Sequence, residues 1–315
     1  MAQTYFRVTN LADVTGQQPT YLAIGSFDGV HRGHQAVIRS LVQQARGDAA
    51  RAAVLTFFPH PKRVVLELNG QHYLNTLDER VALIGRLGVD LIITHPFNET
   101  VRLTRATDFI EQLCLHLNMR QLWGGNFALG YQREGTVDYL QQLGQEKGYT
   151  VELVANMVEW EGKPVSSTRI RHFLEAGDVA AAAACLGYRY RLCGQVVRGN
   201  QLGHTIGFPT ANLSVWDEQL LPAHGVYAAY AWLGEQRLET AVNIGLRPTV
   251  GGQHVRIEAH LLDFSGDLYD KELCLTFVQR IRSEMKFPSL QALQAQIQQD
   301  VETARSILAV APPEA

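Results

Sequence analysis

Residues 20–46 read TYLAIGSFDGVHRGHQAVIRSLVQQAR, and this stretch decides the fold of the first half of the chain. The apolar run at its start predicts a buried β-strand. From residue 33 onward, apolar side chains recur at helical spacing and predict an amphipathic helix. Between the two elements, the turn contains Gly25, Gly29 and Gly33. The stretch therefore predicts a strand, a glycine-rich turn and a helix in succession.

The alternation of predicted strands and helices continues through the first half of the chain. Further strands are expected at residues 52–58, 89–97, 120–125 and 150–158, with helical patterns between them. One such helix opens with a capping box formed by Thr76 and Glu79. Alternating strands and helices predict a parallel sheet covered by helices. Ligands of such sheets bind at the carboxyl ends of the strands, where the glycine-rich turn lies.

The pattern of predicted elements changes near residue 187. Short β-rich runs follow one another without intervening helices, at residues 192–199, 225–233, 237–245, 256–264 and 272–280. A helical stripe then spans residues 289–308. These patterns predict an antiparallel β-barrel closed by a C-terminal helix. We therefore expect two domains, residues 1–186 and 187–315, and we expect the second to fold alone.

Composition narrows the functional class of the chain. Of its 315 residues 46% are hydrophobic and 19% charged, and the net charge is -3, without a basic run. A nucleic-acid partner is therefore not expected. The longest apolar run is too short to cross a bilayer, and no signal-peptide pattern opens the chain, so we expect a cytoplasmic protein without a membrane partner. The cysteines at 114, 185, 193 and 274 form no C-x-x-C pair, and we expect core residues rather than zinc ligands or disulfides.

The glycine-rich turn has the chemistry of a phosphate site. Its glycines let the backbone approach a bulky anion, and the helix after it directs its N-terminus to the same place. His31 and His34 add imidazole N–H groups that can stabilise charge developing at an attacked α-phosphate. This arrangement suits nucleotidyl transfer. The alternative is a tight turn with two solvated histidines, which a bare H-x-G-H pattern does not exclude.

Three further stretches of the first half carry polar side chains suited to a nucleotide. TFFPHP holds His60 between two prolines, and GGNFALG offers the amide of Asn126. VSSTRIR places Ser167 and Thr168 at a helix start, with Arg171 able to clamp a phosphate. Taken singly, each is equally consistent with a rigid loop or an ordinary helix cap.

In this order the four motifs resemble the N-terminal half of the prokaryotic bifunctional riboflavin kinase/FMN adenylyltransferase (FAD synthetase) family. The resemblance implies a Rossmann-like α/β nucleotidyltransferase domain, with His31 and His34 as catalytic contacts to the ATP phosphates. It also implies that His60 and Asn126 lie on the ATP and flavin surfaces. The implied ATP and phosphate ligands are Gly25, Phe27, Asp28, Gly29, Ser167, Thr168 and Arg171. One departure is Leu129, where the family has a second aromatic residue.

The second half contains its own candidate site. In residues 194–213 a glycine-rich stretch precedes Thr210 and Asn212, which lie two apart and so share one side of an extended segment. Mg²⁺ bound to nucleotide phosphates needs only one or two protein ligands. In RIEAHLLDF, Glu258 alternates with Ile257 and could serve as a general base. The alternatives are a loop crossing a barrel end and a solvated Glu258 on the barrel exterior.

GFPTAN, GVYA, AVNIGLRPT, IEAHLLDF, GDLYDKEL and IRSEMKF resemble, in this order, the riboflavin kinase domain of the same family. The resemblance implies that Thr210 and Asn212 bind Mg-ATP and that Glu258 activates the 5′-hydroxyl of riboflavin. The implied nucleotide flap contains Gly199, Gly203, Gly207 and Pro209. His204 departs from the pattern, because the family carries Arg there.

Together the two halves predict a bifunctional enzyme. The barrel is expected to phosphorylate riboflavin to FMN, and the α/β domain to adenylylate FMN to FAD, with ATP and Mg²⁺ and with oligomerisation allowed. One alternative keeps the kinase but makes the first half an inactive nucleotide-binding module. Another is an RNA-handling protein, since H-x-G-H resembles a signature of class I aminoacyl-tRNA synthetases. The absence of a basic face and of a KMSKS-like run argues against that reading.

Overall fold

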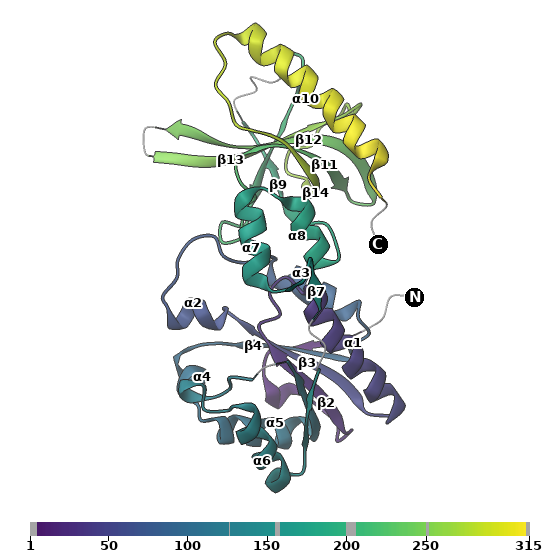
Figure 1. Ribbon diagram of the computed structural model, residues 1–315, viewed down its shortest axis with the longest axis vertical. Coiled ribbons are helices and arrows are strands. Elements are labelled where there is room, and N and C mark those ends of the chain that lie inside the picture. The colour runs from purple at the N-terminus through teal and green to yellow at the C-terminus, as the bar shows by residue number, and fades with distance from the viewer. Residues whose placement is uncertain (1–4, 126, 155–157, 200–205, 250–251, 313–315) are drawn as a thin grey trace. The chain divides into compact units, whose positions relative to one another are not determined.

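The computed structural model describes residues 5–125, 127–154, 158–199, 206–249 and 252–312, and side chains of 247–254 are not described (Figure 1). The chain folds into two compact units. The first contains Met1–Gly70 and Thr76–Ser166. The second contains Gln71–Asn75 and Ser167–Ala315.

A six-stranded parallel sheet forms the centre of the first unit, with the order β1-β4-β3-β2-β5-β6. Its strands are Phe6–Val8 (β1), Thr20–Gly25 (β2), Arg51–Phe58 (β3), Leu91–Pro96 (β4), Met119–Gly124 (β5) and Thr150–Leu153 (β6). A two-stranded hairpin, Glu159–Trp160 (β7) with Lys163–Pro164 (β8), follows. The predicted parallel sheet is confirmed. The edge strand β1 was not predicted, because it has only three residues and no apolar run.

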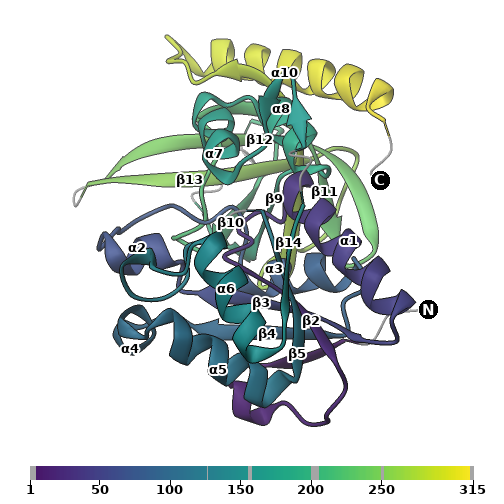
Figure 2. The same cartoon turned by 60° about the horizontal axis from the view of Figure 1, so that its bottom comes forward.

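Helices cover both faces of this sheet (Figure 2). They are Arg32–Gly47 (α1), Pro61–Val65 (α2), Leu77–Gly85 (α3), Glu99–Leu103 (α4), Ala106–Leu117 (α5) and Val137–Lys147 (α6), with 3₁₀ turns at Leu11–Asp13 (η1) and Tyr131–Arg133 (η2). In β2, Leu22 packs in the core that contains α5 and α6, whereas Ala23 packs in the core that contains α1 and α3. Burial on both faces explains why β2 reads as an uninterrupted apolar run.

The second unit contains a closed antiparallel barrel with the order β10-β13-β12-β11-β14-β9. Its strands are Arg191–Val197 (β9), Ala211–Val215 (β10), Gly225–Leu233 (β11), Gln236–Thr249 (β12), Gly252–Leu261 (β13) and Glu272–Ser283 (β14). The C-terminal helix Leu290–Val310 (α10) packs on β11, β12 and β14 (Figure 1). Barrel and closing helix were predicted and are confirmed. Strand β10 was not assigned, because it begins inside the stretch at residues 194–213 that read as a glycine-rich loop.

Two further helices, Ser167–Ala176 (α7) and Val179–Leu186 (α8), belong to the second unit. The backbone N–H of Ala223 donates to the carbonyl of Leu174 at 2.8 Å, and Arg280 Nη1 donates to the carbonyl of Ala176 at 3.3 Å. The segment Gln71–Asn75 joins the same unit, since the N–H of Leu220 donates to the carbonyl of Tyr73 at 2.8 Å. Independent folding of residues 187–315 stays a prediction.

Cys193 and Cys274 form a disulfide in the barrel, so the expectation that all four cysteines are unpaired was wrong. The two residues lie opposite each other on the adjacent antiparallel strands β9 and β14. Their Cα atoms are 4.0 Å apart, although 81 positions separate them in the chain. Spacing in the sequence carried no sign of this contact, because strand pairing alone creates it. Cys114 and Cys185 are not part of a disulfide.

Candidate active sites

The glycine-rich turn lies between Gly25, the last residue of β2, and Arg32, the first residue of α1. Its backbone is left-handed at Phe27, with a φ of 44°, and at Gly29, with a φ of 81°. The turn closes on itself where the N–H of Val30 donates to the carbonyl of Phe27 at 3.0 Å. The side chains of Phe27 and Val30 are buried in the core beside α1. Packing therefore fixes an unusual backbone path at the point where a ligand is expected.

His31 and His34 meet at the start of α1. Their rings stack with centroids 3.6 Å apart. His31 caps the helix, and its Nδ1 accepts from the backbone N–H of His34 at 3.3 Å. An imidazole that accepts at Nδ1 carries its proton on Nε2 in the neutral form. The structure thus brings the two predicted histidines together at the first turn of α1.

Burial determines the charge state of His34. It lowers the pKa of this imidazole well below 6.5, and the neighbouring His31 and Arg80 lower it further. His34 is therefore neutral at neutral pH. Its Nδ1 is buried and has no hydrogen-bond partner among the described residues. Buried polar atoms are rarely left unpaired, so this nitrogen is suited to a ligand.

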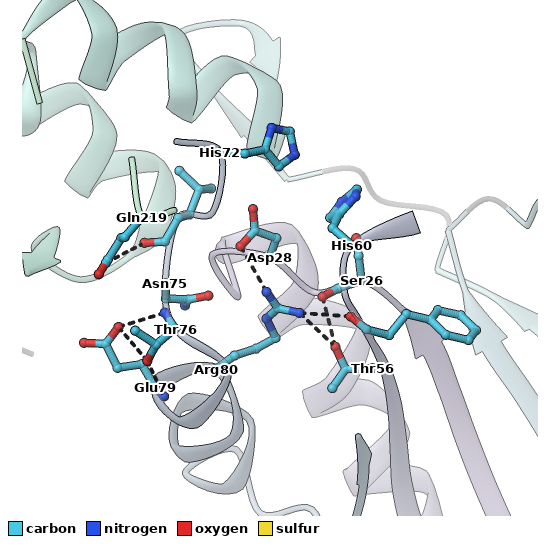
Figure 3. A network of polar contacts seen from close by, with 12 residues as sticks. Ser26, Asp28, Thr56, His60, His72, Asn75, Thr76, Glu79, Arg80 and Gln219 are labelled. Atoms are coloured by element: carbon cyan, nitrogen blue, oxygen red, sulfur yellow. Dashed lines mark hydrogen bonds and ion pairs between the residues drawn. The ribbon is translucent and has the colours of Figure 1, made fainter. Parts of the chain in front are cut away.

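Asp28, predicted as a phosphate ligand, is completely buried in the same turn. Its Oδ1 lies 3.3 Å from Nη2 of Arg80, which α3 contributes (Figure 3). A carboxylate would repel phosphate, whereas one neutralised by a guanidinium does not. Asp28 is thus anchored beneath the turn, and the missed residue is Arg80. The one signal in the sequence is that Arg80 stands in an otherwise apolar helical stripe.

A cavity of about 730 Å³ lies beside this turn. Its volume falls in the usual range of small-molecule sites. Gly25 and His60 line it, together with the aromatic side chains Phe57, Phe97, Phe109 and Phe127. His60 caps α2, its Nδ1 accepting from the N–H of Lys62 at 3.1 Å. Leu129 also lines the cavity, so this departure from the family pattern falls on the cavity wall. Asn126 lies outside the described residues.

Ser167, Thr168 and Arg171 lie on α7, in the second unit. Arg171 Nε donates to the carbonyl of His72 at 2.8 Å. His72 belongs to the short segment that the second unit takes from the earlier part of the chain. The predicted contribution of these three residues to a phosphate site stays a prediction.

A cavity of about 530 Å³ lies between helix α10 and the strands of the barrel in the second unit. Asn212 of β10, Glu258 of β13 and Asn243 of β12 form a row across three adjacent strands. All three side chains line the cavity, as does Thr210. Asn243 was missed because only the strand register shows that it stands opposite Glu258. The row supplies carboxylate and amide oxygens to one small volume.

Asn212 and Thr210 fit a magnesium-nucleotide complex. The Oδ1 of Asn212 is buried and has no hydrogen-bond partner among the described residues. A Cβ atom on Gly199 would lie 2.3 Å from Nδ2 of Asn212, so only glycine fits there. The described residues hold no group of three or more His, Cys, Asp or Glu side chains placed for a metal ion. A Mg²⁺ ion that brings its own phosphate ligands does not need one.

The rest of the predicted flap is only partly described. Gly207 has a left-handed backbone, with a φ of 82°. The carbonyl of Pro209 lies 2.8 Å from Nδ1 of His260, which holds the flap against β13. Gly203 and His204 lie outside the described residues.

Glu258 points into the cavity between the barrel and α10. Its neighbours Ile257 and Ala259 are buried on the other side of β13, as the alternation predicted. Arg256, two residues earlier on the strand, places Nη1 3.0 Å from Oε1 of Glu258. This contact orients the carboxylate of Glu258 on the side of β13 that lines the cavity.

Helix α10 closes the cavity on one side, contributing Leu293, Ile297, Asp300 and Val301 to its wall. The Asp300 carboxylate accepts from Nε of Arg282 at 2.9 Å and from Nη2 at 2.7 Å. A buried bidentate pair of this kind fixes both orientation and distance. The wall that α10 provides is therefore tied to β14.

A glycine-rich turn on a parallel sheet, and a cavity between an antiparallel barrel and helix α10, provide two candidate active sites, as expected of a transferase with two activities. Residues 13–169 match the family model of FAD synthetase, and residues 186–308 match that of riboflavin kinase. The chain belongs to the bifunctional riboflavin kinase/FMN adenylyltransferase family. It phosphorylates riboflavin to FMN and adenylylates FMN to FAD, as its two matched domains and its relatives show.

Relatives match along nearly the whole chain. The bifunctional riboflavin kinase/FMN adenylyltransferase of Pseudomonas fluorescens is 38% identical over 91% of this chain and 92% of its own length. That of Escherichia coli K12 is 37% identical over 94% and 95%. A crystal structure from Streptococcus pneumoniae, described as a macrolide-efflux protein, is 30% identical, with a TM-score of 0.86 over 96% of this chain and 98% of that one. Among the described residues of the present chain, no helix has the length and apolarity to span a membrane.

Proposed function

We propose that the barrel cavity performs the kinase reaction with Glu258 as general base. The row of Asn212, Glu258 and Asn243 carries this proposal, because it places a base beside oxygen ligands in one cavity. The 5′-hydroxyl of riboflavin attacks the γ-phosphorus of ATP, its proton passes to Glu258, and ADP leaves. Thr210 and Asn212 would hold Mg²⁺, which neutralises phosphate charge when bound.

Glu258→Gln tests this assignment. The amide preserves shape and hydrogen bonding but cannot accept a proton, so FMN formation should fall at least ~100-fold, the low end of general-base effects. FAD formation from supplied FMN should continue in the same preparation, and thermal unfolding checks that the second unit remains folded. Initial rates of both half-reactions at saturating substrate are the measurement. A kinase rate within a few-fold of the parent would remove Glu258 from the mechanism.

We propose that adenylyl transfer takes place at the turn between β2 and α1. The FMN phosphate attacks the α-phosphorus of ATP, and pyrophosphate leaves. The stacked imidazoles of His31 and His34 would contact the phosphate oxygens, with Nδ1 of His34 as one contacting atom. The aromatic cavity beside the turn, which His60 lines, would hold the flavin ring. Asn126, Ser167, Thr168 and Arg171 are proposed to complete this site.

Replacing both His31 and His34 by Ala should stop FAD formation and leave FMN formation intact. Loss of one transition-state donor costs roughly 10²–10³ in rate, and this double variant loses two. Thermal unfolding of the variant checks that the α/β unit remains folded. Near-parental FAD production would show that the chemistry takes place elsewhere.

We also propose that the protein works in the cytoplasm, because both of its reactions consume ATP. Small-molecule substrates are the proposed partners, with no nucleic acid, and an oligomer is allowed. In a reducing compartment the Cys193–Cys274 pair would be held as two thiols. Thiol labelling of rapidly quenched cells, compared with the purified protein, tests this expectation.

A further inference from the structure

A single arginine connects the ends of two strands in the first unit. Arg80 on α3 is completely buried. Its Nη2 donates to Oδ1 of Asp28 at 3.3 Å, and its Nη1 donates to the carbonyl of Phe57 at 3.3 Å and to Oγ1 of Thr56 at 3.4 Å (Figure 3). The same hydroxyl of Thr56 donates to the carbonyl of Ser26 at 3.0 Å. These contacts tie the turn after β2 to the end of β3.

The two connected segments carry the histidines of the adenylyl-transfer site. Asp28 precedes His31 by three residues, and Phe57 precedes His60 by three. Strands β2 and β3 are parallel neighbours, with Gly25 opposite Thr56, so both segments leave the same edge of the sheet. Ligands of parallel sheets bind at this edge. Arg80 therefore lies beneath the place where the two histidine-bearing segments must be held in register.

Packing alone does not account for an arginine at this position. Val81 and Ile84 supply the apolar face with which α3 covers the sheet. A buried guanidinium is costly unless it is paired, and an apolar side chain often fills such a position at lower cost. The planar fork of arginine, however, can donate in several fixed directions at once. That property matches a group that must hold two chain segments at a set distance.

We propose that Arg80, paired with Asp28, is a positioning residue for adenylyl transfer that holds the His31–His34 turn and the His60 segment in catalytic register. This inference rests on the proposed location of that reaction. Asp28 then acts through the turn rather than on the ATP phosphates. Neither side chain needs to touch substrate.

The test replaces Arg80 by Met and by Lys in the full chain and measures kcat and KM for FAD formation from FMN and ATP. A misplacement of about 1 Å costs on the order of 10²-fold in rate, so Arg80→Met should lower kcat about 100-fold. KM for ATP should change less than about threefold, because the same phosphate donors remain. Arg80→Lys keeps the charge but loses the fork, and should recover kcat to about 10-fold below the parent.

The chain offers two matched controls. Riboflavin phosphorylation by the same preparation reports on the second unit and should be unchanged. Arg7→Met removes an ion pair with Asp78, which lies on α3 like Arg80. This pair is exposed, since the side chain of Arg7 is 38% exposed and that of Asp78 is 85% exposed. This variant should retain parental kcat and KM for FAD formation.

Each outcome decides between a positioning role and its alternatives. A folded Arg80→Met variant with parental kcat overturns the proposal. A variant whose KM for ATP rises by the same factor as its kcat falls also overturns it. If Arg80→Met does not fold, Arg80→Lys decides, since parental kcat there would show that the fork is not needed. Failure of the site assignment is distinguishable, because the His31/His34 double variant would then remain active.

Discussion

Burial fixes the charge of two histidines in the first unit. Desolvation lowers the pKa of His34 well below 6.5, with His31 and Arg80 adding to the effect, and desolvation also lowers the pKa of His95. In the unfolded chain both imidazoles regain their ordinary pKa near 6.5. Folding therefore favours the neutral form, and protonation opposes folding.

The lowered pKa values make the first unit less stable below about pH 6.5. Above about pH 6.5 both imidazoles are neutral in the folded and in the unfolded chain, so they do not make the free energy of unfolding depend on pH. Below it the unfolded chain binds protons that the folded chain excludes, so the free energy of unfolding falls by up to about 1.4 kcal/mol per pH unit for each histidine. Urea unfolding of the first unit between pH 7.5 and 5 measures this slope. His34→Asn should make this slope shallower, and an unchanged slope would contradict a lowered pKa of His34.

At the scale of elements, α10 matters because it is both a wall of the kinase cavity and a lid on the barrel. Ala304 and Leu308 bury its apolar stripe against Ala228 and Tyr230 of β11. The polar anchor of the helix is Asp300, which pairs with Arg282 while its side chain is only 5% exposed. Amphipathic packing sets where the helix lies, and the ion pair sets its register along β14.

Asp300→Ala should destabilise the second unit by about 3 kcal/mol, because it leaves the guanidinium of Arg282 without its buried partner. Kinase activity should be lost at a lower temperature, whereas FAD formation from FMN persists. Asp263→Ala is the control, since it removes an exposed ion pair with Arg305 of the same helix and should change little. Equal unfolding midpoints for the two variants would contradict an anchoring role.

At the scale of the molecule, the second unit is discontinuous in sequence. It takes Gln71–Asn75 from the first half of the chain, and it includes α7 and α8. Tyr73 is fully buried there and stacks on Trp216 with ring centroids 4.9 Å apart. A barrel fragment that lacks these pieces loses packing that the full chain has.

We expect a fragment of residues 167–315 to fold and to phosphorylate riboflavin, and a fragment of 187–315 to melt at a lower temperature. The shorter fragment lacks the hydrogen bond from Ala223 to Leu174 and the contact of Arg280 with Ala176. Thermal melting and kinase rates of both fragments, beside the full chain, are the measurement. Equal melting temperatures would place the working boundary at residue 187.

Much of the fold and of both sites could be predicted from local patterns. The run in β2 and the helical stripe of α1 are periodic over several residues, and the capping box of Thr76 and Glu79 forms as predicted. The contributions of Asn243, Arg80 and Asp300 escaped prediction. Each depends on a partner far away in the chain, and single-sequence periodicity contains no such information.

The sequence by itself determined the change from alternating strands and helices to successive strands. It also determined the parallel sheet, the barrel with its closing helix and the pairing of His31 with His34. These features follow from short-range spacing, which dictates the faces of helices and strands. Only the tertiary structure decided the disulfide of Cys193 with Cys274, the row of Asn212, Glu258 and Asn243, and the burial of Asp28 on Arg80. Strand register and helix packing create those contacts, and both are set by the burial of the whole core rather than by neighbours in sequence.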